Sequence, residues 1–196
     1  MTTGIKKPKG LLLTPGASAG REQPSLVALD EALTPMGIVV SRWDFPYRLA
    51  GRRAPDKAPV LIESVREGAS ELAKVAKARP TSIALGGRSM GGRMCSMAVA
   101  DGLKAAALVL ISYPLHPPGK PDQLRTDHFP GIDVPCLFVS GTRDAFGTPD
   151  ELTKATKRIA GPVTHVWVEG GDHGLKRKDS QVVDAVGSWL SGRYRQ

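Results

Sequence analysis

The most constraining feature of the sequence is the segment Gly87-Arg88-Ser89-Met90-Gly91, in which glycine stands two residues before and two residues after a serine. An apolar run over residues 82–86, typical of a buried strand, leads directly into it, and a helical pattern follows. So sharp a turn needs small residues on both sides of the serine, because larger side chains would collide with the strand and the helix. The segment therefore predicts a turn that raises the Ser89 hydroxyl above a sheet.

The same glycine-rich residues could instead form a phosphate-binding turn. That alternative requires a Lys-Ser/Thr pair after the glycines or a G-x-G-x-x-G spacing, and the segment contains neither. We therefore interpret Ser89 as a nucleophile. It needs a base, because a free hydroxyl reacts poorly near neutral pH.

Short apolar runs alternate with longer segments of helical spacing along the chain. The predicted strands cover residues 10–14, 38–43, 82–86, 106–112, 136–141 and 164–169, and the predicted helices cover residues 24–35, 59–78, 89–101, 148–160 and 180–190. Most strands are continuously apolar, as expected where both faces of a parallel sheet are covered. The pattern predicts a single α/β domain over residues 1–196. Its sheet is doubly wound, mostly parallel and six-stranded, with helices on both faces and no cap domain.

Two features of this pattern lie outside the strands. The apolar stripe of the second helix includes Leu72 and Val75, which we expect to be buried. Residues 46–58 and 113–135 have no regular pattern, and each stretch follows the carboxyl end of a strand. Ligands bind beyond those ends in open α/β sheets, so we expect both stretches to help form the site.

Chain order selects the base for Ser89. In this strand–turn–helix arrangement an acid and then a histidine follow the serine. His173 lies between the last predicted strand and the last predicted helix, where the base is required. His165 lies within a strand, and His116 and His128 precede the fifth strand, so we expect other roles for them.

The acid and the oxyanion donors follow from the same layout. Asp144 comes directly after the fifth predicted strand, whereas Asp150 belongs to a helix-capping box and Asp172 adjoins the histidine. The backbone N–H of Met90, after the nucleophile, is one expected oxyanion donor. We expect the second from the loop after the first strand, at Ala17.

The chain is basic, with 27 lysine and arginine residues against 19 acidic residues and a net charge of +8. The basic residues are scattered and aromatic residues are only 5%, so we do not expect a nucleic-acid partner. We expect substrate binding by Arg48, Arg52, Arg53 and His116. With Arg88 and Arg143 these arginines favour an anionic acyl substrate, because a guanidinium binds carboxylates bidentately. Structural ion pairs are the alternative for Arg88 and Arg143.

Other classes of protein are not expected from this sequence. No apolar run approaches the ~18 residues of a membrane helix, and three leucines at residues 11–13 are too short a stretch for a secretory signal. The two cysteines, Cys95 and Cys136, cannot build a disulfide framework or a four-ligand zinc site. We expect a cytoplasmic protein without membrane insertion.

Six segments resemble the α/β-hydrolase superfamily, on its dienelactone hydrolase-like side. They are residues 14–17, 42–48, 86–93, 113–120, 140–147 and 171–173. The resemblance extends to a small capless subgroup that also includes a subunit of a chromatin-associated acetyltransferase complex. It implies a triad of Ser89, Asp144 and His173. Pro15 stands where the family usually has histidine, which leaves the second oxyanion donor open.

Together these features predict a serine hydrolase that cleaves an ester, thioester, lactone or related acyl bond of a small molecule through an acyl-enzyme. No metal or organic cofactor is implied. The alternative is a non-catalytic interaction module within a protein complex. The positive net charge favours this alternative, as does the resemblance, because some members of the subgroup are subunits of complexes.

Overall fold

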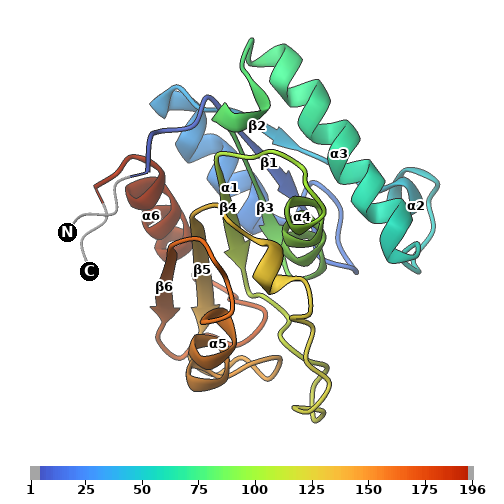
Figure 1. The fold of residues 1–196 in the computed structure, drawn as a ribbon, viewed down its shortest axis with the longest axis vertical. Helices are drawn as coiled ribbons and strands as arrows, with labels where there is room; N and C mark the ends of the chain where they lie inside the picture. The colour runs from blue at the N-terminus through green and yellow to red at the C-terminus, as the bar shows by residue number, and fades with distance from the viewer. Residues whose placement is uncertain (1–4, 194–196) are drawn as a thin grey trace.

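The computed structural model describes residues 5–193, and six strands in this part of the chain form one sheet. The strands lie in the order β2-β1-β3-β4-β5-β6, and every neighbouring pair is parallel (Figure 1). They are β1 (Gly10–Thr14), β2 (Val39–Arg42), β3 (Ile83–Arg88), β4 (Ala107–Ile111), β5 (Cys136–Gly141) and β6 (Val163–Val168). The predicted α/β fold is confirmed, and the sheet is parallel throughout.

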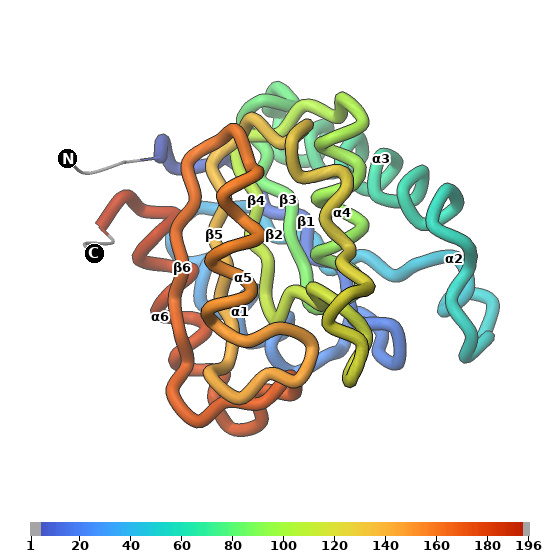
Figure 2. The backbone as a smooth tube through the Cα atoms, turned by 60° about the horizontal axis from the view of Figure 1, so that its bottom comes forward, coloured from blue at the N-terminus to red at the C-terminus, as the bar shows by residue number. Residues whose placement is uncertain are grey.

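Helices cover both faces of this sheet. On one face lie α1 (Pro24–Leu33) and α6 (Asp179–Leu190), and on the other lie α3 (Ala58–Val75), α4 (Met90–Ala100) and α5 (Pro149–Thr156) (Figures 1 and 2). Because both faces are covered, successive β1 residues enter different cores: Leu12 packs with α3 and α4, and Leu13 packs with α1 and α6. No helix among residues 5–193 is long and apolar enough to cross a membrane.

The strand order places the site. From β1 the chain runs outward to β2 and then crosses back over β1 to β3. The connections that leave β1 and β3 therefore diverge at their carboxyl ends, which is where ligands bind in open α/β sheets. The long segment between β4 and β5, which contains only the short 3-10 turn η3 (Phe129–Gly131), extends from this same end (Figure 1).

Apart from shifts of one to three residues at the ends of elements, the structure differs from the sequence-based expectations in three places. Residues 46–58, expected to be irregular, contain a short helix, α2 (Pro46–Leu49), which proline begins. The helix after the capping box ends at Thr156, short of residue 160. Val75 is 69% exposed, because Leu72 already packs at Gly10 and the next turn of α3 extends beyond the start of β1.

Two apolar residues on the last turn of α3 test this description of the core. Leu72→Ala should lower the free energy of unfolding by about 2–5 kcal/mol, because Leu72 is 2% exposed and its loss leaves a cavity. Val75→Ala, at the exposed last residue of the helix, should change it by less than about 0.5 kcal/mol. Urea unfolding followed by circular dichroism measures both. Equal losses in the two variants would contradict the assigned packing.

Candidate active site

Ser89 lies in the turn between β3, which ends at Arg88, and α4, which begins at Met90. Its backbone angles, φ 51° and ψ −117°, fall in a region that residues with side chains rarely adopt. The Ser89 amide donates a hydrogen bond of 2.8 Å to the carbonyl oxygen of Ile111, at the end of β4. The neighbouring strand thereby holds this strained backbone in place.

Two glycines let this turn lie directly against the end of β1. A Cβ atom on Gly87 would lie 2.3 Å from the carbonyl oxygen of Thr14, and one on Gly91 would lie 2.4 Å from the same oxygen. Both distances are far below van der Waals contact, so any side chain would force the two backbones apart. The close approach brings Ser89 beside Gly16, in the loop that follows β1.

Hydrogen bonds join Ser89, His173 and Asp144 in series. The Ser89 Oγ lies 2.9 Å from His173 Nε2, and His173 Nδ1 lies 3.0 and 2.9 Å from the two carboxylate oxygens of Asp144. The Asp144 side chain is only 1% exposed. A proton on Nδ1, bound by Asp144, leaves Nε2 free to accept the proton of the serine hydroxyl. The structure thus brings together the three residues that chain order selected.

Two further side chains fix the imidazole and its loop. The ring of Phe146 stacks on His173 with 3.9 Å between the ring centroids, and the Phe146 amide donates a hydrogen bond of 2.8 Å to Asp144 Oδ1. Arg88 Nη2 donates to the carbonyl oxygen of His173. Burial lowers the pKa of Arg88, and the charge of Asp144 acts in the opposite direction. Arg88 thereby links the strand before the nucleophile to the loop of the histidine.

Other histidines have partners of their own, away from Ser89. His128 Nε2 lies 2.8 Å from Ser96 Oγ, and burial lowers the pKa of His128 to about 4, which leaves it neutral at neutral pH. His165 Nε2 lies 3.0 Å from Thr156 Oγ1, and burial lowers its pKa as well. Both histidines pack as part of the fold.

The loop after β1 is held at two points beside Ser89. The Gly16 amide donates a hydrogen bond of 3.1 Å to Gln23 Oε1, and the Tyr47 hydroxyl donates one of 2.8 Å to the Ala17 carbonyl oxygen. Met90 supplies the first amide of α4, at a helix end where N–H groups have no acceptor within the helix. Tyr47 was not anticipated from the sequence, and it is how residues 46–58 support the site.

A cavity of about 490 Å³ opens at Ser89. Its walls include His173, the loop after β1 and Pro114 of the segment after β4. Three arginines also line it: Arg88, Arg93 and Arg125.

The residues predicted to bind substrate are not part of this cavity lining: Arg48, Arg52, Arg53 and His116. Arg52 instead pairs with Asp56 at 2.8 Å, and the His116 imidazole lies 2.8 Å from the Pro117 carbonyl oxygen. The three arginines follow β2, and β1 with its loop stands between this edge strand and Ser89. Arg143 is exposed and is not part of the lining either.

Arg93 and Arg125 were not anticipated from the sequence. A signal for Arg93 existed, because it lies four residues after Ser89, about one helical turn along α4. No local signal marks Arg125, which lies in the long segment between β4 and β5 and reaches the cavity only through the fold.

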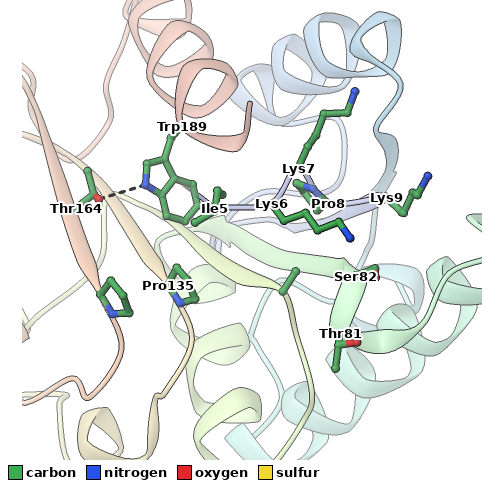
Figure 3. Close-up of a pocket in the computed structure, with 12 residues that line it drawn as sticks. Ile5, Lys6, Lys7, Pro8, Lys9, Thr81, Ser82, Pro135, Thr164 and Trp189 are labelled. Carbon is green, nitrogen blue, oxygen red and sulfur yellow. Dashed lines mark hydrogen bonds between the residues drawn. The ribbon is translucent and has the colours of Figure 1, made fainter. Parts of the chain in front are cut away.

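A second cavity, of about 460 Å³, lies at the opposite, amino-terminal end of the strands. Trp189 forms part of its wall and donates a hydrogen bond of 3.2 Å to Thr164 Oγ1 (Figure 3). The amines of Lys6, Lys7 and Lys9 point away from the indole ring (Figure 3). The lining contains none of the residues of the hydrogen-bonded series, which lie at the first cavity.

Comparison with known families agrees with this architecture. The alpha/beta hydrolase domain model matches residues 7–189. The chain belongs to the α/β-hydrolase family. This confirms the family inferred from the sequence. The expected similarity to the capless subgroup that includes a chromatin-complex subunit stays a prediction.

Solved structures of α/β hydrolases share the fold. A dienelactone hydrolase from Anabaena variabilis aligns with a TM-score of 0.75 and 16% identity, over 100% of this chain and 90% of that one. An α/β serine hydrolase without a lid from Xanthomonas campestris gives 0.71 and 19%, over 96% and 82%. One of two metagenome-derived lipolytic enzymes gives 0.72 and 14%, over 95% of both chains. At such identities the likeness shows the fold.

Two helical glycines of this α/β hydrolase provide a matched test of the turn. Gly91→Ala should destabilise the protein by about 1–3 kcal/mol, because its Cβ would meet the Thr14 carbonyl oxygen at 2.4 Å. Gly187→Ala, in α6, meets nothing closer than 3.8 Å and should stabilise by up to about 1 kcal/mol through helix propensity. Thermal unfolding measures both. A stabilised Gly91→Ala variant would contradict the close contact.

Proposed function

We propose that this chain is a serine hydrolase that cleaves an ester, thioester, lactone or related acyl bond through an acyl-enzyme. The observation that carries the proposal is the series Ser89–His173–Asp144 at an open cavity, with each member within hydrogen-bond distance of the next. A hydroxyl, an imidazole and a buried carboxylate in this order are the groups that nucleophilic acyl transfer requires.

In the proposed mechanism each of the three residues has one role. Ser89 Oγ attacks the substrate carbonyl carbon while His173 Nε2 takes the hydroxyl proton. His173 then gives that proton to the leaving group, and the acyl group stays on Ser89. Water attacks the acyl-enzyme with His173 again as base, which releases the acid and restores the serine. Asp144 orients the imidazole and stabilises its protonated form.

Backbone amides stabilise the negative oxygen of the tetrahedral intermediate in this proposal. Pro15 has no N–H, and the Gly16 amide already donates to Gln23, so Ala17 offers the next amide in the loop after β1. Met90, the first residue of α4, offers the other at a helix end that favours negative charge. The Tyr47 hydroxyl acts as a positioning group, because it fixes the carbonyl of Ala17.

The rival proposal is a non-catalytic interaction module built on the same fold. The strained backbone of Ser89 favours the enzyme, because strain of this kind has a cost and is concentrated at functional sites. A module would have no need of the aligned serine, histidine and aspartate.

A fluorophosphonate probe tests the nucleophile directly. We expect one covalent adduct on the native protein by intact mass spectrometry, at Ser89, because its hydroxyl lies 2.9 Å from His173 Nε2. Ser89→Ala should carry no adduct. Ser70→Ala, which removes an exposed hydroxyl on α3, should react as the unaltered protein does. An unreactive native protein would overturn the proposal and favour the interaction module.

A pair of aspartates tests the role of the acid. Asp144→Asn should lower kcat for an activated ester by about 10³–10⁴-fold, because an amide does not hold the imidazole in the required tautomer or stabilise its charge. Asp172→Asn, at the exposed neighbour of His173, should change kcat by less than about twofold. Steady-state release of 4-nitrophenol measures both. The reverse order of effects would assign the acid to Asp172.

A further inference from the structure

Positive charge is concentrated at the wall of the cavity that contains Ser89. Arg93 and Arg125 line it from different elements: Arg93 from the first turn of α4, and Arg125 from the segment between β4 and β5. Arg88 lines it too, but its guanidinium already donates to the His173 carbonyl oxygen and so holds the loop of the histidine. Arg93 and Arg125 are therefore the two arginines of the cavity wall whose guanidinium groups are available to bind a substrate.

The backbones of both arginines are fixed. The Arg93 amide donates a hydrogen bond of 3.1 Å to the Ser89 carbonyl oxygen, which places Arg93 one helical turn beyond the nucleophile. The Arg125 amide donates one of 2.8 Å to the Leu115 carbonyl oxygen, and the Arg125 carbonyl accepts one of 2.8 Å from the Tyr113 hydroxyl. Tyr113 is itself buried. The two guanidinium groups thus extend from anchored positions and not from a free loop.

Within residues 5–193, no ion pair or side-chain hydrogen bond joins either guanidinium to another side chain. The Arg93 Nε donor is buried and has no hydrogen-bond acceptor. Burial lowers the pKa of Arg125, and the positive charge of Arg93 lowers it further. Two like charges at one cavity without a carboxylate partner repel each other, so this arrangement calls for an anion that the chain itself does not supply.

We propose that Arg93 and Arg125 form an anion subsite for an acyl substrate that carries a carboxylate or a phosphate group in addition to its scissile bond. The inference rests on the proposed hydrolase function. Planar guanidinium groups donate paired hydrogen bonds to either anion. The subsite would orient the substrate with its carbonyl at Ser89, and it replaces the sequence-based assignment of this role to Arg48, Arg52 and Arg53.

A matched pair of esters tests the subsite. The anionic member is 4-nitrophenyl hydrogen adipate and the neutral member is 4-nitrophenyl methyl adipate, with the uncatalysed rate of each subtracted. We expect kcat/KM to be at least about tenfold higher for the anionic ester, because a charged pair of this kind adds a net hydrogen-bond contribution. Arg93→Gln and Arg125→Gln should each reduce this ratio of the two esters by about tenfold.

A control arginine separates the subsite from a general charge effect. Arg79 is exposed and precedes β3, at the end of the sheet opposite Ser89. Arg79→Gln removes the same unit charge and should leave the ratio of the two esters unchanged. An equal kcat/KM for both esters in the native protein, or an equal loss of preference in Arg79→Gln, would overturn the proposal.

Thermal unfolding with adipate or inorganic phosphate provides a readout that needs no turnover. A ligand that binds only the folded state raises Tm, so either anion should raise it in the native protein and in Arg79→Gln, and not in Arg93→Gln or Arg125→Gln. A shift with phosphate alone would identify the anion as phosphate, and one with adipate alone as carboxylate. Equal shifts in all four proteins, or none, would overturn the subsite. A failure of Ser89 to react with the fluorophosphonate would instead overturn the hydrolase function.

Discussion

The contact of one backbone with another, where the turn at Ser89 meets the end of β1, is the constraint on which the site depends. Gly87 and Gly91 both lie against the Thr14 carbonyl oxygen at distances that leave no room for a Cβ atom. The same contact places the loop after β1 beside the nucleophile, so one packing requirement fixes both the serine and its expected oxyanion donors. The parallel sheet order supplies this contact, because β1 and β3 are direct neighbours.

A second close approach fixes the other half of the site. A Cβ atom on Gly141, at the end of β5, would lie 2.2 Å from the Gly171 carbonyl oxygen, and the Arg143 amide donates a hydrogen bond of 2.8 Å to that oxygen. These backbone contacts join the loops that carry Asp144 and His173 directly to each other, independently of their contacts with Ser89. Catalytic geometry of this kind must be held to within a fraction of an ångström, and backbone contacts provide that rigidity better than flexible side chains.

The strands, the helices and the three residues of the hydrogen-bonded series could be predicted because their signals are local. A continuously apolar run, a proline at a helix start and a glycine on either side of a serine can each be identified within a few residues. The burial of Val75 was predicted wrongly. The apolar stripe of a helix does not show where the strand that it packs against begins. The positions of Arg48, Arg52 and Arg53 could not be predicted for the same reason. Their distance from Ser89 depends on which strand lies at the edge of the sheet.

Arg93 and Arg125 show a further limit of prediction from sequence. They differ from Arg88, the third arginine of the cavity wall, in that their guanidinium groups have no hydrogen-bond or ion-pair partner among the described residues. Their proximity to each other, and the missing acceptor at Arg93 Nε, are properties of the folded chain that no segment of sequence displays. Arginine stays charged at neutral pH even where burial lowers its pKa. The repulsion between the Arg93 and Arg125 guanidinium groups is therefore present under ordinary conditions and opposes folding. Local choices that conflict with stability in this way are typical of functional sites. An anion at the proposed subsite would offset the repulsion between the two arginines, which connects the cost in stability to the proposed choice of substrate.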